Sequence, residues 1–179
     1  YTKKLHSHQK PLFSLSMKIE SLSLAYGNKY ILRDITLDIS REDFIFLIGT
    51  SGSGKTSFIQ SLIGELAPRS GHILDRQGRD IYRLSRSELL GYRRTLGIIF
   101  QDFKLLPHKT VEQNVAFAME VCGYSDADIR RRVPEVLAQV GLLTKKKKMI
   151  ETLSGGEIQR TSIARALIHD PEIIIGDEP

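Results

Sequence analysis

The sequence predicts an α/β fold with a mainly parallel sheet, an antiparallel β layer and an inserted helical lobe. Three observations lead to this fold class. An apolar run at 44–48 (FIFLI) continues into a glycine-rich stretch and a helical pattern, which is the strand, loop and helix order of a parallel sheet. Short alternating runs over 18–39 are typical of paired antiparallel strands. Helical apolar periodicity over 110–140 precedes a last apolar run at 173–175.

Length and composition limit the alternatives. The 179 residues can form one domain, or one domain with an inserted lobe. Hydrophobic and charged contents of 41% and 26% are typical of a globular protein with a real core. No apolar run approaches the roughly 18 residues that span a bilayer. The single Cys122 excludes an internal disulfide framework, and the net charge of +5 permits nucleic-acid or membrane contact without selecting either.

Local start and stop signals predict the elements between these landmarks. Gly27 and Asn28 interrupt the alternating runs, which predicts a turn between two strands. Further along, the sequence predicts a helix over 57–66 ended by the stretch 67–71, a strand at 72–74 before a turn at Gln77 and Gly78, a short helix capped by Ser85 or Ser87 that runs through Tyr92, and a strand at 96–100.

Two helices are expected in the lobe. The first begins at Thr110, and its expected apolar stripe consists of Val111, Val115, Met119 and Val121. Ser125 with Asp128 can cap the second, which runs through Val140. The chain therefore passes from strands to a glycine-rich loop, to strands again, and to helices before the last strand.

The glycine-rich stretch from Gly49 to Thr56 reads GTSGSGKT and fits the phosphate-binding loop pattern. Its glycines let backbone N–H groups turn inward, and the following helix offers its positive end to an anion. Lys55 would neutralise the β- and γ-phosphates, and the Thr56 hydroxyl would ligate Mg²⁺. We therefore predict a nucleoside triphosphate site, against an ordinary Gly/Ser loop. The binding residues expected from this stretch are Gly49, Thr50, Ser51, Gly52, Ser53, Gly54, Lys55, Thr56 and Ser57.

A second motif, LSGGE from Leu153 to Glu157, resembles the signature motif of the ATP-binding cassette (ABC) ATPases. A serine and two glycines at a helix N-terminus allow a phosphate to approach bare backbone N–H groups closely. The resemblance implies a head-to-tail homodimer that forms with ATP. In it, Ser154, Gly155, Gly156 and Glu157 would contact ATP bound by the opposite subunit. A simple helix cap is the alternative.

The last apolar run, IIIGDE at 173–178, resembles the Walker B strand of the same family. An apolar strand that ends in two acids holds them at the carboxyl edge of a parallel sheet, where ligands bind. The resemblance implies that Asp177 orients Mg²⁺ and that Glu178 acts as general base on the attacking water. Two solvated acids are the alternative.

Two further residues take their expected roles from position in this family. Gln101 follows the strand at 96–100, as the family's Q-loop glutamine does, which implies contact with Mg²⁺ and the lytic water. With Lys55 and Glu178 it completes the expected catalytic set. Tyr26 matches the aromatic residue that stacks on adenine, while Tyr30 is a competing candidate and plain sheet packing stays open.

The stretch FQDFKLLPHKTVEQNV at 100–115 resembles the branch of the family that serves bacterial cell division, the FtsE ATPases. These pair with an integral membrane protein of the FtsX type, so the resemblance implies a peripheral protein at the cytoplasmic face of the cell membrane. The partner would contact the surface from Asp102 to Pro107, although packing within the lobe is the alternative for its apolar residues. ATPases of lipoprotein release and macrolide export are the rival relatives, and an ATP-gated interaction module with little hydrolysis is a rival class.

No nucleic-acid partner is expected, because the interval from Gln101 to Ser154 is too short for the coiled coils of DNA-repair ATPases. The run KKKK at 145–148 allows contact with anionic lipid, with a solvated loop as the alternative.

The domain expected from the resemblance is a RecA-like P-loop NTPase core over 17–179 with a helical subdomain at about 102–160. Residues 1–16 are interpreted as an extension or scar, because Met17 opens a run that looks like a natural start. The family continues beyond the Walker B acids with a strand that lies between the strand at 44–48 and the strand at 173–175. We therefore expect a truncated domain with unpaired strand edges and weak or absent hydrolysis by this chain alone.

Overall fold

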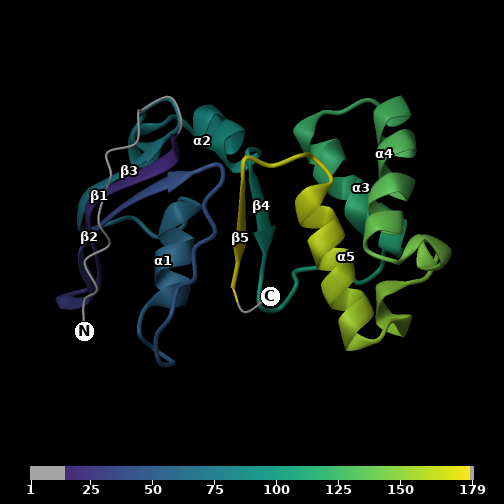
Figure 1. The fold of residues 1–179 in the computed structure, drawn as a ribbon, viewed down its shortest axis with the longest axis horizontal. Coiled ribbons are helices and arrows are strands. Elements are labelled where there is room, and N and C mark those ends of the chain that lie inside the picture. The colour runs from purple at the N-terminus through teal and green to yellow at the C-terminus, as the bar shows by residue number, and fades with distance from the viewer. Residues whose placement is uncertain (1–14, 178–179) are drawn as a thin grey trace. The chain divides into compact units, whose positions relative to one another are not determined.

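The structure, a computed structural model, describes residues 15–177 of the chain. The predicted base Glu178 and most of the predicted extension lie outside the described residues. The chain divides into two compact units, one up to Arg93 and one from Arg94 onward. Figure 1 shows the elements coloured along the chain. Both helices and strands are present in each unit, as the α/β prediction requires.

The first unit is built on a three-stranded antiparallel sheet in the order β2-β1-β3 (Figure 1). Its strands are β1 (Leu15–Tyr26), β2 (Lys29–Ser40) and β3 (Ser70–Asp75). Tyr26 pairs with Lys29, so Gly27 and Asn28 form a two-residue hairpin loop, with Gly27 at φ 56°. The predicted antiparallel layer and its turn are confirmed.

The core face of β1 changes parity in mid-strand. Met17, Ile19, Leu22 and Leu24 are all fully buried, which strict alternation does not allow. The pairing register shifts between Ile19 and Leu22, and Ser21 there adopts φ 46°. A bulge at this point therefore returns Leu22 and Leu24 to the core side.

Helix α1 (Lys55–Leu62) follows the glycine-rich loop and is anchored at its C-terminus by side chains from η2 (Ile81–Arg83) and α2 (Arg86–Arg93). The Tyr92 hydroxyl donates to Leu62 O at 2.6 Å, and the Tyr82 hydroxyl donates to Ser61 O at 2.8 Å. Arg93 Nε donates to Ile63 O at 2.9 Å. These bonds satisfy carbonyls that a helix end leaves unpaired. Burial raises the pKa of both phenols, so both remain donors.

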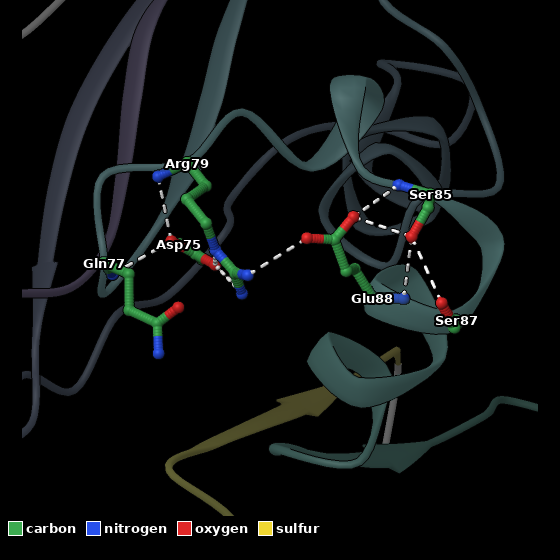
Figure 2. Close-up of polar contacts among 6 residues, drawn as sticks. All are labelled: Asp75, Gln77, Arg79, Ser85, Ser87 and Glu88. Carbon is green, nitrogen blue, oxygen red and sulfur yellow. Dashed lines mark hydrogen bonds and ion pairs between the residues drawn. The ribbon is translucent and has the colours of Figure 1, made fainter.

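The connection from β3 to α2 is held by a chain of polar contacts (Figure 2). The buried Asp75 carboxylate accepts from the backbone N–H groups of Gln77 and Arg79 and from Arg79 Nε, each at 2.9 Å. Arg79 also lies 3.6 Å from Glu88, whose carboxylate accepts from Ser85 N at 2.9 Å. Of the two predicted caps of α2, Ser85 is therefore the one in place.

The second unit contains the parallel pair β4 (Leu96–Ile99) and β5 (Ile173–Gly176) and a helical lobe (Figure 1). The lobe consists of α3 (Val111–Cys122), α4 (Asp126–Gln139), η3 (Leu143–Lys145), η4 (Ile150–Thr152) and α5 (Gly155–Leu167). Thr110 caps α3 and Ser125 caps α4, as predicted. Helices α3, α4 and α5 share one buried apolar cluster, which includes Val111, Val115, Met119, Val136, Leu137 and Ala164.

The prediction that Val121 belongs to the buried apolar stripe of the first lobe helix is wrong. Val121 is 51% exposed, whereas Val111, Val115 and Met119 are buried. The three buried residues follow one another at intervals of four, and Val121 lies only two positions beyond Met119. That spacing turns its side chain away from the face that the other three share.

The prediction of a strand at 44–48 is also wrong, because the structure has no strand there. The segment has no regular structure, and its end residues Phe44 and Ile48 are 83% and 94% exposed. A strand forms only where its N–H and C=O groups find ladder partners, and no strand within residues 15–177 pairs with this segment. The Phe44 and Phe46 rings instead contact each other edge to face at 4.9 Å. The described parallel sheet is consequently limited to β4 and β5.

Within the described part of the chain, the helices are all too short or too polar to span a bilayer.

Candidate functional site

The glycine-rich loop at 49–56 has the backbone that its pattern predicts. Gly52 and Gly54 lie at φ 76° and 97°, and Ser53 N donates to Thr50 O at 3.1 Å to close a tight turn. A Cβ added to Gly54 would lie 2.5 Å from Ile31 Cγ2 on β2. A larger residue at position 54 would therefore require the Ile31 side chain to shift, in addition to backbone strain at φ 97°.

The start of α1 is arranged for an anion. Gly54 supplies no side-chain cap, and the first turn contains no acidic residue, so its backbone N–H groups are not taken by a carboxylate. Lys55 Nζ donates to the carbonyl oxygens of Gly49 and Thr50 at 3.0 and 3.1 Å, which places the ammonium across the loop. Thr56 and Ser57 lie in the same first turn. Donors and charge therefore converge where a phosphate chain is expected.

The two tyrosines proposed for adenine differ in their surroundings. The guanidinium carbons of Arg33 and Arg69 lie 4.1 and 5.2 Å from the centre of the Tyr30 ring, and Arg69 also donates to Gly27 O at 2.8 Å. Tyr26, at the end of β1, is 57% exposed. Tyr30 is thus engaged by cations, and Tyr26 is the better candidate for stacking.

The structure brings Gln101 and Asp177 to one edge of the parallel pair. Ile99 pairs with Gly176 at the carboxyl ends of β4 and β5, and Asp177 N donates to Ile99 O at 3.0 Å. Asp177 follows directly after β5 and Gln101 lies two residues after the end of β4, and both supply oxygen atoms, which Mg²⁺ prefers. They fit the predicted magnesium role within the second unit. The third predicted ligand, Thr56, belongs to the first unit.

Ser154 of the LSGGE motif occupies the N-cap of α5, and Gly155, Gly156 and Glu157 lie in its first turn. Glu157 Oε2 accepts from Ser154 N at 2.9 Å and from Ser154 Oγ at 3.0 Å. Lys145 Nζ lies 2.9 Å from Glu157 Oε1. Bonds from the Ser154 backbone, from Lys145 and from the Ser154 hydroxyl lower the pKa of Glu157 to about 2. A Cβ added to Gly155 would meet nothing within 4 Å, so the turn is open to approach.

Sequence reasoning missed the residues that hold the surface at 102–107. Arg165 of α5 donates to Lys104 O and Phe103 O, each at 2.6 Å. The buried Asn114 of α3 accepts from Leu106 N at 2.7 Å and donates back to Leu106 O at 3.0 Å. A polar residue on the buried face of a predicted helix is a signal that could have identified Asn114.

The apolar residues of this surface are only half-buried, and Leu105 packs against the lobe core. Lobe packing, the alternative interpretation, therefore applies to Leu105.

The run at 145–148 is partly neutralised within the lobe. Lys145 pairs with Glu157, and Lys147 Nζ lies 2.7 Å from Glu112 Oε1. Two of the four charges are thus paired with acids of this chain, although the Lys147 side chain remains 77% exposed.

Comparisons with known proteins agree with these motifs. Residues 32–179 match the ABC transporter family. The cell division ATP-binding protein FtsE of Streptococcus pneumoniae is 43% identical over 148 residues, which cover 83% of this chain and 64% of that protein. The methionine import ATP-binding protein MetN of Carboxydothermus hydrogenoformans is 42% identical over 164 residues, which cover 90% of this chain and 48% of that protein. The chain therefore spans less than two thirds of the length of these relatives.

Among solved structures, a dimeric post-hydrolysis state of an ATP-binding cassette bound to ADP and Pi has a TM-score of 0.81 at 30% identity. The similarity covers 91% of this chain and 74% of that one. It confirms the predicted α/β fold class. Because the family match extends over residues 32–179, this chain belongs to the ABC transporter family.

Proposed function

We propose that this chain is the ATP-binding and ATP-hydrolysing subunit of an ABC complex of the FtsE type, which couples ATP to an FtsX-like membrane partner in bacterial cell division. The observation that carries the proposal is the presence, in one chain, of the glycine loop with its Lys55 contacts and of the open, capped first turn of α5. Each element supplies donors for phosphate, and each is half of a site.

The P-loop half would bind the triphosphate. Backbone N–H groups of 49–56 and the start of α1 would receive the phosphate oxygens, and Lys55 would exchange its carbonyl partners for the β- and γ-phosphates. Tyr26 would stack on the adenine. Thr56, Gln101 and Asp177 would hold Mg²⁺, which would neutralise the charge that develops on the transferred phosphate.

The chemical step would be an in-line attack by water on the γ-phosphorus, with release of ADP and inorganic phosphate. Glu178 would accept the proton of that water, and Gln101 would orient it. The test is Glu178→Gln in the full-length protein. We expect turnover to be lost while ATP binding is retained, and undiminished turnover would refute the assigned base.

The other half of each site would come from a second copy in a head-to-tail dimer. Ser154, Gly155 and Gly156 would approach the γ-phosphate across the interface, as the openness at Gly155 permits. ATP would close the dimer, and hydrolysis would open it. A solved ATP-binding cassette of similar fold is itself a dimer bound to ADP and Pi, which supports this arrangement.

The membrane partner would contact the surface at 102–107, so the subunit would be peripheral on the cytoplasmic face of the cell membrane. The FtsE name of a 43% identical relative supports this partner class, and the MetN name of another supports methionine import as the second candidate. Co-purification of the full-length protein from membranes separates them. Co-purification of an FtsX-type protein would support our proposal, whereas co-purification of an import or export permease would support a transport function instead.

A third candidate is an ATP-gated interaction module, which would bind ATP with little turnover. Steady-state ATPase assays with and without the membrane partner distinguish it, because only a coupled ATPase is stimulated by the partner.

A further inference from the structure

The run at 145–148, here called the four-lysine segment, ties together the first turns of two helices. On the α5 side, Lys145 Nζ lies 2.9 Å from Glu157. On the α3 side, Lys147 Nζ lies 2.7 Å from Glu112, and the N–H of Glu112 donates to Lys146 O at 3.0 Å. The segment therefore links the start of α3, which follows the surface at 102–107, to the start of α5, which carries the LSGGE motif.

The two carboxylate oxygens of Glu157 face different partners. Oε2 accepts from both the N–H and the hydroxyl of Ser154, and Oε1 is held by Lys145. The Glu157 side chain is only 16% exposed, whereas that of Lys145 is 44% exposed. A carboxylate held at both oxygens has one orientation, so the Ser154 hydroxyl that it accepts from is oriented too.

We propose that Lys145 is a positioning residue for the LSGGE turn. It acts through Glu157 to fix Ser154 and the first turn of α5 in the orientation that accepts the γ-phosphate bound by a second copy. This inference rests on the proposed function of Ser154 to Gly156 in the dimer. It assigns a role to a residue that lies outside the motif, 12 positions before Glu157 in the chain.

The physical reason is that the held Glu157 carboxylate fixes the N-terminal end of the turn. Glu157 takes the N–H and the hydroxyl of Ser154, and the N–H groups of Gly155 and Gly156 follow in the open part of the turn. Without Lys145, the carboxylate is held through Oε2 alone, so its orientation is less fixed and the donors of the turn are presented in one arrangement for less of the time. The ion pair is partly exposed, so its loss should weaken dimer formation by about two- to fivefold.

The experiment measures the concentration of MgATP that gives half-maximal dimer, by light scattering, in the full-length protein carrying Glu178→Gln to suppress turnover. Lys145→Met should raise that concentration about two- to fivefold. Lys145→Arg should restore it, because arginine keeps the ion pair. Lys148→Met is the matched control: this exposed lysine belongs to the same segment, and its side chain makes no hydrogen bond or ion pair with another residue of 15–177.

A double-mutant cycle tests whether the effect passes through Glu157. In a Glu157→Gln background, Lys145→Met should weaken dimer formation no further. The measurement is made at 0.15 M salt, where direct attraction between Lys145 and the phosphates of ATP is screened beyond about 8 Å. Equal losses in both backgrounds would overturn the proposal, because Lys145 would then act as an independent charge. The proposal would also be overturned if Lys145→Met leaves the MgATP concentration for half-maximal dimer unchanged, even if this substitution lowers the melting temperature. If the Glu178→Gln protein with its native Lys145 fails to dimerise with MgATP, the result would instead contradict the proposed function, and this proposal with it.

Discussion

The guanidinium of Arg165 lies 2.6 Å from the carbonyl oxygen of Phe103, and so connects α5 to the segment proposed to meet the membrane partner. Phe103 and Lys104 both have left-handed backbones, at φ 57° and 46°. For residues with a side chain this conformation costs on the order of 1 kcal/mol or more each. The two charge-assisted bonds from Arg165 offset that cost, so α5 stabilises a shape that the segment would not keep alone.

Replacing Arg165 with Met should lower the free energy of unfolding by about 1.5–3 kcal/mol, because the half-buried Phe103 carbonyl and the exposed Lys104 carbonyl both lose a charged donor. Urea unfolding of the full-length protein measures the change. Arg130→Met on the exposed surface of α4 is the control, and an equal effect of the two substitutions would contradict the account. Adding Lys104→Gly to Arg165→Met should recover part of the loss, since glycine adopts the left-handed backbone freely.

Gly54→Ala should be far more damaging than Gly78→Ala. Both glycines have positive φ, at 97° and 75°, so both substitutions introduce backbone strain. A Cβ at 54 would also lie 2.5 Å from Ile31, whereas one at 78 meets nothing within 4 Å. We expect about 1 kcal/mol of destabilisation at position 78 and a larger loss at 54 together with loss of nucleotide binding. Urea unfolding and titration with a fluorescent ATP analogue measure both quantities, and similar values at the two positions would be inconsistent with the close packing.

Substitutions of Tyr26 and Tyr30 should have different effects, the first on ATP affinity and the second on folding stability. Tyr26→Ala should weaken ATP binding about tenfold or more, since stacking on an aromatic ring contributes about 1–3 kcal/mol per base. Tyr30→Ala should leave ATP affinity near its original value and lower stability by about 0.5–1 kcal/mol through loss of cation–π contacts. Isothermal titration calorimetry and thermal unfolding give the two readouts. Weaker ATP binding in the Tyr30 variant alone would reverse the assignment.

The Glu157 cap should give a distinct pH dependence. The pKa of Glu157 falls from its ordinary 4.5 to about 2 in the folded protein, so the carboxylate stabilises the folded state above pH 4.5. This contribution decreases as the pH falls from 4.5 towards 2. The difference in unfolding free energy between the protein and its Glu157→Gln variant should therefore shrink over that interval. A difference that stays constant from pH 6 to pH 3 would show that the carboxylate is not held as described.

Local signals in the sequence predicted the caps and turns of this fold well. Thr110, Ser125 and Ser154 begin helices because each needs only a neighbour three residues away. The parity change in β1 was not predictable, because a bulge depends on the partner strand. The strand expected at 44–48 failed for a related reason: an apolar run becomes a strand only when another strand pairs with it.

In the candidate site, too, the features set by neighbouring residues were predictable and those set by distant residues were not. The backbone of 49–56 and the position of Asp177 follow from motifs whose residues are adjacent in the chain. The contact of Arg165 with Phe103 joins residues 62 positions apart, and no local pattern indicates it. Lys145 belongs to a run of four lysines with similar sequence surroundings, so only the fold distinguishes it as the partner of Glu157.

The central claim is that each ATP site combines the glycine loop of one copy with the LSGGE turn of another. Mixing two inactive full-length variants, Lys55→Ala and Ser154→Arg, tests it most directly. A head-to-tail heterodimer would contain one site with both defects and one intact site, so the mixture should regain up to about a quarter of the unsubstituted ATPase rate. A rate that stays at the sum of the two separate variants would contradict the shared site.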